Sequence, residues 1–349
     1  MQPRIGTSRT RTSTPGPGAP STQAPGSHRW PGCSRCRAVR LWRAPRSPVP
    51  ENVAGPVLVA GGSGFVGRRL VAALDEAGRE IRVLTRRPGN HRGPGTAVHG
   101  DVTDPGTLAE PLEGCSSAYY LVHSLGSADF ESRDAEAAAT FGKQAAAAGV
   151  GQIVYLGGLG DDADDLSAHL RSRREVEHLL GEAGVPVTVL RAGIVVGHGG
   201  ISWEITRQLV EHLPAMVTPR WVRTRTQPIA VADVVRYLVG VLDNPDAVGR
   251  TFEIGGPDVL AYADMLKRVA AIEERTLPIL PVPLLTPGLS SRWLAFVTDV
   301  DTRTGRNLVD SMTNTVVVND PSIREVVPFP PMSYDDAVRV ALAERRGER

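Results

Sequence analysis

Three glycines spaced three residues apart constrain the fold of this chain more than any other feature. Gly61, Gly64 and Gly67 follow the apolar stretch Pro56–Ala60 and overlap the start of the amphipathic stretch Phe65–Ala77. A short apolar stretch ahead of a helical period predicts a buried strand followed by a helix. Glycine permits a sharp turn between them, because it has no Cβ to oppose the backbone torsion angles of such a turn.

This turn has the properties of a phosphate-binding loop. Bare backbone N–H groups lie at the N-terminus of the helix, where the helix dipole adds partial positive charge. A second apolar stretch ends about twenty residues later, which completes the context of a dinucleotide-binding fingerprint. We therefore expect the loop to contact the pyrophosphate of a dinucleotide; the alternative is a tight turn without a ligand. The expected contact residues are Gly61, Gly62, Ser63, Gly64, Phe65, Val66 and Gly67.

Short apolar strands alternate with helices from this loop to about residue 195. Such alternation predicts βαβ units that form a parallel sheet with helices on both faces. The expected fold class is therefore α/β, a doubly wound parallel Rossmann sheet with a small C-terminal α/β cap. Further strands are expected at 80–85, 96–100, 117–122, 152–156 and 185–191, and further helices at 130–148, 166–183, 201–213 and 232–242.

Three regions follow from these patterns. Residues 1–50 are rich in Arg, Pro, Gly, Ser and Thr and lack a hydrophobic period, so we expect a disordered extension. Residues 54–195 are the expected dinucleotide-binding core. Residues 196–345 are the expected cap or substrate region, interleaved with the core and containing an irregular proline-rich segment at 277–290. We expect this cap over the carboxyl ends of the strands, where open α/β sheets bind ligands.

Charge is divided unevenly along the chain. Of 39 basic and 38 acidic residues, residues 1–50 hold nine arginines and no acid. The remainder is mildly acidic, which argues against nucleic-acid binding by the folded part. The extension is interpreted as an upstream segment, with a nucleic-acid arm or a transit peptide as alternatives. Its Cys33 and Cys36 form only a weak metal or redox motif.

Apolar runs and cysteines bear on the cellular setting. No apolar run approaches the roughly 20 residues that span a bilayer, and the N-terminus has no apolar segment typical of a secretory signal. Three cysteines are not a disulfide framework. We therefore expect a cytoplasmic protein without a membrane span; a homo-oligomer or a protein partner stays open.

The end of the second strand bears on the choice of dinucleotide. Thr85, Arg86 and Arg87 lie where an NAD enzyme usually has an acidic residue for the ribose 2′-hydroxyl. Two guanidinium groups pair with a 2′-phosphate instead, so we expect NADP(H) as the preferred cofactor, with NAD(H) as the alternative. After the third strand, we expect Asp101 to accept from the adenine amino group, with Val102 beside it. A capping or turn role for Asp101 is the alternative.

Four segments add to the glycine loop: Tyr120-Leu-Val-His-Ser124, Ile153-Val-Tyr-Leu-Gly-Gly158, Gln227-Pro-Ile-Ala-Val-Ala-Asp-Val234 and Phe252-Glu-Ile-Gly-Gly-Pro-Asp258. Together they resemble the extended and atypical branch of the short-chain dehydrogenase/reductase superfamily. They are most similar to its atypical NAD(P)H-binding group, which is allied to NmrA-like proteins, sugar-nucleotide epimerases and the mitochondrial complex I Rossmann subunit. The resemblance runs from about residue 56 to 343.

Active members of that family use a Ser or Thr after the fifth strand and a Tyr-x-x-x-Lys pair on the next helix. This chain has Gly157 and Gly158 where the Ser is expected, and the resemblance places His169 and Arg173 over the Tyr and Lys. Positions i and i+4 share a helix face. His169 is therefore a candidate for proton transfer near neutral pH, and Arg173 for holding the nicotinamide ribose. The alternative is a helix with a surface His and Arg.

The loop after the fourth strand is expected to border the nicotinamide. Val122 and His123 are candidate cofactor contacts there, and His123 is a second candidate acid. Arg191 is a candidate for binding a substrate anion, with a structural salt bridge as an equal alternative. No His, Cys and Glu cluster has metal-ligand spacing, so no metal is expected. The expected substrate contacts are Ser124, Gly157, Gly158 and Arg191.

Two functions fit these residues. The first is an NADP(H)-dependent oxidoreductase acting on a small carbonyl or quinone-like compound, in which the cofactor carries the chemistry and the protein orients it. The second is a non-catalytic NADP(H)-binding redox sensor or structural module, because the Ser, Tyr and Lys of the family are missing. A sugar-nucleotide epimerase is a third and weaker hypothesis, because that chemistry normally needs the same Tyr and Lys.

Overall fold

The computed structural model describes residues 55–124, 126–127, 129–162, 164–218, 220–281 and 311–347. These residues belong to one compact unit. The extension expected over residues 1–50, including Cys33 and Cys36, lies outside them, as does the part of the proline-rich segment beyond residue 281.

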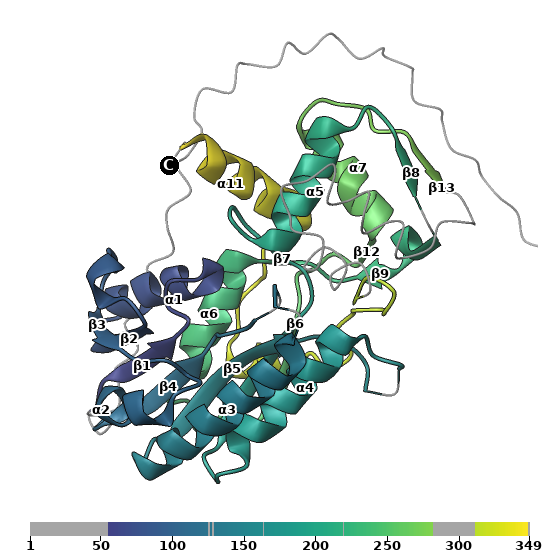
Figure 1. The fold of residues 1–349 in the computed structure, drawn as a ribbon. Helices are drawn as coiled ribbons and strands as arrows, with labels where there is room; N and C mark the ends of the chain where they lie inside the picture. The colour runs from purple at the N-terminus through teal and green to yellow at the C-terminus, as the bar shows by residue number, and fades with distance from the viewer. Residues whose placement is uncertain are drawn as a thin grey trace, which may run out of the picture. The chain divides into compact units, whose positions relative to one another are not determined.

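Seven parallel strands form the central sheet, in the order β11, β6, β5, β4, β1, β2 and β3 (Figure 1). From β1 the chain moves outward to β2 and β3, crosses back to β4 on the other side of β1, and continues outward to β5 and β6. The predicted doubly wound parallel Rossmann sheet is therefore confirmed. Its switch point lies between β1 and β4, where sheets of this type bind ligands. The strands are β1 (Val57–Ala60), β2 (Ile81–Thr85), β3 (Thr96–His99), β4 (Ser117–Tyr120), β5 (Gln152–Gly158), β6 (Val187–Ala192) and β11 (Thr251–Ile254).

Helices cover both faces of this sheet, because its strands are apolar on both sides. Successive side chains of a strand point to opposite faces. Val57 and Val59 of β1 accordingly pack in one hydrophobic core, with one pair of helices. Leu58 and Ala60 pack in a second core on the opposite face, with another pair. The pairs are α1 (Phe65–Glu76) with α6 (Val231–Val241), and α3 (Phe130–Ala147) with α4 (Ala168–Gly181).

A third hydrophobic core lies in the C-terminal half of the chain, around the fully buried Trp203. It joins the helices α5 (Ile201–His212), α7 (Tyr262–Ile272) and α11 (Tyr334–Arg346). Between them in sequence, α6 and β11 return to the central sheet, so this half of the chain contributes to both parts. The short elements are α2 (Ala109–Leu112), α10 (Ile323–Val326), and the strand pairs β7 (Val195–Val196) with β10 (Ile229–Ala230), β9 (Arg225–Thr226) with β12 (Leu260–Ala261), and β8 (Met216–Thr218) with β13 (Ile279–Pro281).

The elements predicted from the sequence agree with the structure to within about two residues at each end, whereas β11, α7 and α11 had no prediction. The signals for α11 were present. The Ser333 hydroxyl accepts from the backbone N–H of Asp336 at 3.2 Å and caps the N-terminus, and Gly347 ends the helix with φ +72°. Such a pair of start and stop residues is readable in a sequence.

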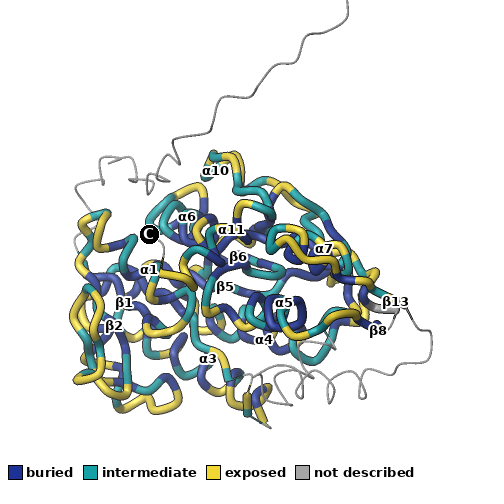
Figure 2. The backbone as a smooth tube through the Cα atoms, turned by 90° about the horizontal axis from the view of Figure 1, so that it is seen from above, coloured by how far each residue is buried: buried dark blue, intermediate teal, exposed yellow. Residues whose placement is uncertain are grey.

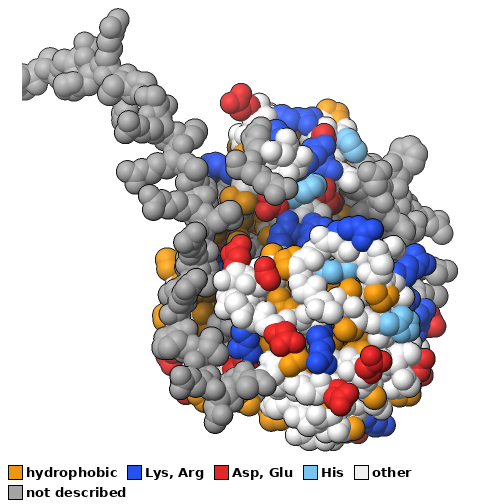
Figure 3. All heavy atoms as spheres, turned by 90° about the vertical axis from the view of Figure 1, so that its left-hand side faces the viewer, with side chains coloured by type: hydrophobic (Ala, Val, Ile, Leu, Met, Phe, Trp, Pro, Cys, Tyr) orange, Lys and Arg blue, Asp and Glu red, His pale blue; other side chains and the backbone are white. Residues whose placement is uncertain are grey.

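Exposure follows the layers of the fold. Most strands of the central sheet are buried, and exposed residues gather on loops and outward helix faces (Figure 2). On the face shown in Figure 3, positive and negative side chains are interspersed, and hydrophobic side chains occur in small groups. No helix in the described ranges is long and apolar enough to cross a membrane, and no three His, Cys, Asp or Glu side chains there are placed to hold a metal ion.

Candidate functional site

The glycine turn after β1 is closed by its own backbone. Gly61 has φ +86°, a conformation that residues with a Cβ rarely adopt. The N–H of Gly64 donates to the carbonyl oxygen of Gly61 at 3.0 Å. A Cβ at Gly67 would collide with that same oxygen. Helix α1 therefore starts directly against the end of β1.

The N-terminus of α1 has no side-chain cap. Gly64 occupies the N-cap position, and the first turn contains no acidic residue. The first backbone N–H groups of a helix have no acceptor within it, so an anion at this point gains both hydrogen bonds and the helix dipole. Gly61 and Ser63 line a cavity here.

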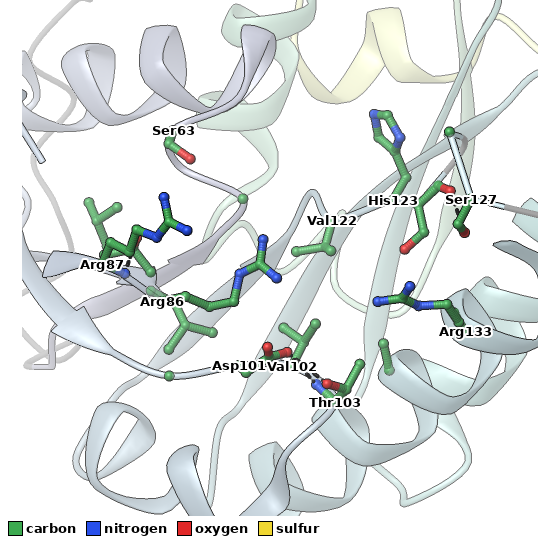
Figure 4. A pocket seen from close by; sticks show the side chains of 18 of the residues that line it. Ser63, Arg86, Arg87, Asp101, Val102, Thr103, Val122, His123, Ser127 and Arg133 are labelled. Atoms are coloured by element: carbon green, nitrogen blue, oxygen red, sulfur yellow. Dashed lines mark hydrogen bonds between the residues drawn. The ribbon is translucent and has the colours of Figure 1, made fainter. Parts of the chain in front are cut away.

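This cavity has a volume of about 800 Å³ and lies at the carboxyl ends of the strands β1 to β4 (Figure 4). Its volume falls within the roughly 300–1,000 Å³ typical of small-molecule and cofactor sites. The remaining residues of the predicted loop form the turn and the first turn of α1 behind its lining. The expected site residues that line it are Gly61, Ser63, Thr85, Arg86, Arg87, Asp101, Val102, Val122, His123 and Ser124.

Arg86 and Arg87 extend into the cavity from the turn after β2 (Figure 4). Both side chains are exposed, and neither has an ion-pair partner in the part of the chain that the structure describes. The hydroxyl of Thr85 accepts from the backbone N–H of Arg87 at 3.2 Å and holds the turn. Two cations without an ion pair among the described residues thus lie at the cavity wall, and the acid that responds to the charge of Arg86 is Asp101.

Asp101 lines the same cavity from the turn after β3. Its Oδ1 accepts from the backbone N–H of Thr103 at 3.0 Å and from the Thr103 hydroxyl at 2.8 Å. Burial alone would raise the pKa of Asp101, but these hydrogen bonds and the charges of Arg86 and Arg133 together lower it. Asp101 is therefore ionised at neutral pH. The turn role left open by the sequence is realised by Oδ1, and the adenine contact stays a prediction.

His123 follows β4 and lies on the opposite side of the cavity from Arg87 in Figure 4. His123 is exposed to solvent, although many protein atoms lie around its ring. This crowding, and secondly the charge of Arg173, lower the pKa of His123 to about 4. At neutral pH the ring is therefore uncharged, with one nitrogen as hydrogen-bond donor and the other as acceptor.

His169 and Arg173 lie one turn apart on α4. Burial lowers the pKa of His169 to about 3, and Arg173 and His123 act in the same direction. The side chains of His123, His169 and Arg173 are therefore neighbours. Of these three, only His123 lines the cavity. A His169 that is uncharged at neutral pH differs from the expected proton-transfer residue, because its surroundings disfavour the charged imidazolium.

Gly157 and Gly158 carry the end of β5 against α4. A Cβ on Gly158 would lie 2.8 Å from Cδ2 of Leu170, and a Cβ on Gly157 would lie 2.7 Å from Oε1 of Glu177. At both positions the nearest atom is the far end of a flexible side chain, so a serine would require Leu170 or Glu177 to shift. Neither glycine lines the cavity described above.

Arg191 at the end of β6 forms a salt bridge. Its Nη2 lies 2.7 Å from Oε2 of Glu177, and its Nη1 lies 3.3 Å from Oδ2 of Asp162. Arg174 pairs with the same two acids. The salt-bridge alternative is the arrangement found, and Arg191 is absent from the described cavity lining.

Three residues near this site had no prediction from the sequence. Arg133, on the first turn of α3, lines the cavity and points into it (Figure 4). Asp134 and Tyr155 are buried, and both respond to the charge of Arg173. Arg133 offered no clear signal, because it lies among the acids Glu131, Asp134 and Glu136 at the start of the helix. Tyr155 gave none, because a Tyr inside an apolar strand reads as core.

Both the sequence and the fold are similar to those of known proteins. A family model described as NAD(P)H-binding matches residues 61–245. The (4-alkanoyl-5-oxo-2,5-dihydrofuran-3-yl)methyl phosphate reductase of Streptomyces griseus is 28% identical over 233 residues, which cover 63% of this chain and 75% of the reductase. The mitochondrial NADH dehydrogenase (ubiquinone) 1 alpha subcomplex subunit 9 of Mus musculus is 24% identical over 251 residues, which cover 67% of this chain and 66% of that protein.

The fold is similar to that of an NADPH-dependent quinone oxidoreductase from Escherichia coli, solved in complex with NADPH. The TM-score is 0.68, and the match covers 81% of this chain and 98% of the oxidoreductase. Sequence identity in this match is 17%, so the likeness concerns the fold.

Proposed function

The chain belongs to the NAD(P)H-binding family, and from this premise we propose that it is an NADP(H)-dependent reductase of a small carbonyl or quinone-like compound. Its relatives include a reductase whose name describes a phosphate ester as substrate. Membership of the family implies NAD(P)H binding. The preference for NADP(H) and the class of substrate are what we propose beyond it.

The observation that carries the NADP(H) preference is the pair of guanidinium groups at the end of β2, which form no ion pair among the described residues. Arg86 and Arg87 would pair with the 2′-phosphate through charge-assisted hydrogen bonds. An NAD-specific site usually places an acid there to accept from the ribose 2′-hydroxyl, and this turn has none.

The remaining lining fits the other parts of the cofactor. The uncapped N-terminus of α1 would hold the pyrophosphate, and the crowded glycines Gly61 and Gly67 keep side chains out of that approach. Asp101 would accept from the adenine amino group, while Val122 and His123 would border the nicotinamide. When bound, NADPH supplies a hydride; the protein binds it, orients it and limits the access of water.

The two histidines would act as uncharged hydrogen-bonding groups. With pKa values of about 4 for His123 and about 3 for His169, neither is protonated at neutral pH. Their role in this proposal is to orient a substrate carbonyl oxygen by hydrogen bonding.

Binding of the cofactor is tested first. Calorimetry with NADPH and NADH should give a Kd for NADPH at least tenfold lower than for NADH. Oxidation of NADPH is then followed over aldehydes, ketones and quinones. Failure to bind either nucleotide, or tighter binding of NADH, would overturn the cofactor assignment.

A matched pair of variants controls this experiment. Gly64→Arg places a large side chain at the N-cap of α1 and should abolish binding and turnover. Gly151→Arg adds the same side chain just before β5, at the opposite end of the sheet, where a Cβ makes only ordinary contact at 3.4 Å. If the native protein oxidised NADPH no faster than Gly64→Arg, the proposed reductase function would be rejected.

A non-catalytic binding module is the second candidate, and the residues Gly157 and Gly158 favour it. These glycines supply no hydroxyl at the place where active members of the family use a Ser or Thr. Such a module would bind NADP(H) without turnover. A redox sensor would also need different affinities for NADP⁺ and NADPH, because a ligand pair of equal affinity shifts no equilibrium.

A further inference from the structure

Arg173 is a buried cation without a counter-ion. It is 8% exposed, and its Cγ lies 3.5 Å from the position of a Cβ on Gly158, so its stem packs across the end of β5. Among the described residues, no carboxylate forms an ion pair with it. An unpaired charge in such surroundings is strongly unfavourable.

Arg207 provides the comparison within the same chain. It is 7% exposed and pairs with Glu204 at 2.9 Å and also with Glu211. The less buried Arg191 pairs with two acids as well. Of the two arginines that are more than nine-tenths buried in the described ranges, only Arg173 lacks an acid.

Most of the groups around Arg173 offer hydrogen-bond donors. The hydroxyl of Tyr155 is buried and lies within hydrogen-bonding reach of Arg173, and its own O–H has no acceptor among the described residues. His169 and His123 respond to the same charge. Burial raises the pKa of the neighbouring Asp134, which also responds to Arg173 without forming an ion pair. A cation surrounded by donors is complementary to an oxyanion.

The cluster adjoins the cofactor cavity at the end that should receive the substrate. His123 lines that end, across the cavity from Arg87 (Figure 4), and the next residue, Ser124, also lines the cavity. His123 both lines the cavity and responds to the charge of Arg173, so it links the cavity to the cluster. A substrate held beside His123 would therefore have its anionic group within reach of the guanidinium.

We propose that Arg173, together with the Tyr155 hydroxyl and His169, forms an oxyanion-binding site, and that the substrate is a small carbonyl compound bearing a carboxylate or phosphate group. The inference rests on the proposed reductase function and names its class of substrate. The bound anion would supply the negative charge that Arg173 lacks among the described residues.

Anion binding is tested by calorimetry with inorganic phosphate and with acetate as probes. The protein is first saturated with NADPH, so that phosphate-binding positions of the cofactor are filled. The native protein should bind at least one probe, and Arg173→Met, which keeps the length of the stem, should bind it at least tenfold more weakly. Arg173→Lys should restore part of the affinity, because it restores the charge.

Arg171→Met is the matched control, since Arg171 lies on the same helix but is exposed. It should leave probe binding unchanged. Equal weakening by both variants would show a general effect of charge, and undiminished binding in Arg173→Met would show that the probes occupy another position; either result overturns the site.

Thermal unfolding without anions separates a binding role from a structural one. Without a bound anion, the buried charge of Arg173 does not stabilise the folded state. Arg173→Met should therefore have a Tm equal to or above that of the native protein. A Tm lowered by more than about 5 °C, which exceeds the shift that about 1 kcal/mol causes in a protein of this size, would show that Arg173 stabilises the fold and would overturn the proposal.

The class of substrate is tested with pairs of carbonyl compounds that differ only in a carboxylate or a phosphate. The native enzyme should prefer the anionic member by at least tenfold in kcat/KM, and Arg173→Met should lose this preference. If NADPH binds and is oxidised but neutral substrates are preferred, the anion site fails and the reductase stands. If NADPH does not bind, the reductase fails, and probe binding measured on Gly64→Arg still decides the anion site.

Discussion

Gly67 lies so close to the carbonyl oxygen of Gly61 that the first turn of α1 has no room for a side chain at this position. The contact joins the helix to the turn that precedes it. It also fixes the position of the uncapped backbone N–H groups of α1 relative to the cavity. A displacement at Gly67 should therefore lower both the stability of the fold and the affinity for the cofactor.

Gly67→Ala is expected to destabilise the protein by about 1–3 kcal/mol, the usual range for overpacking a close contact. The added Cβ would displace the Gly61 carbonyl oxygen and the turn with it, so the affinity for NADPH should fall too. Urea unfolding and calorimetry measure the two effects. Gly151→Ala is the control, because its Cβ would lie 3.4 Å from the nearest atom. Equal stability of the two variants would contradict the close approach.

Alanine at both Arg86 and Arg87 is expected to lower the affinity for NADPH by a factor of about 100. Each lost hydrogen bond between charged groups contributes about 1.5 kcal/mol, or roughly tenfold. The affinity for NADH should change by less than about threefold, since NADH has no 2′-phosphate. Arg339→Ala removes one charge from the exposed face of α11 and should change neither Kd. An equal loss of affinity for NADPH and NADH would mean that the two arginines contact a part of the cofactor other than the 2′-phosphate.

His123 and His169 are expected to make the protein less stable in acid. Their folded-state pKa values are lowered to about 4 and about 3, below the value of about 6.5 expected in the unfolded chain. The unfolded chain therefore binds more protons in this window, so the stabilising contribution is fully present above about pH 6.5 and is lost as the pH falls towards 4 and then 3.

Tm measured between pH 7.5 and 4.5 tests this expectation. The double variant His123→Gln, His169→Gln should show a smaller fall in Tm than the native protein. His178→Gln, an exposed histidine on α4, is the control and should follow the native profile. A double variant with an unchanged profile would mean that the two rings are not held in the uncharged form.

Glu177→Gln is expected to lower the free energy of unfolding by about 2–3 kcal/mol, because it leaves Arg174 and Arg191 with one largely exposed acid, Asp162. Asp162→Asn should cost less than about 1 kcal/mol, since that carboxylate is 61% exposed. Denaturant unfolding measures both. Cofactor affinity should be unchanged in both variants, and a loss of affinity without a loss of stability would return Arg191 to the binding site.

The cofactor side of the site was accessible from the sequence because its residues follow directly on strands. Arg86, Asp101 and His123 each come just after an apolar stretch, and the carboxyl ends of parallel strands meet at one edge of a sheet. Knowing that the strands were parallel was therefore enough to bring these residues together. Arg133 escaped prediction because it comes from the start of a helix.

The sequence by itself determined the glycine turn and the alternation of strands and helices, because torsional freedom and hydrophobic period depend on neighbours along the chain. Only the tertiary structure decided that Arg191 has counter-ions and that Arg173 has none within the described ranges. Glu177 lies closer in sequence to Arg173 than to Arg191, yet it pairs with Arg191 across the packing of α4 on β6. Ion pairing and the shifts in the histidine pKa values depend on distance through space and on exclusion of water, which sequence spacing does not encode.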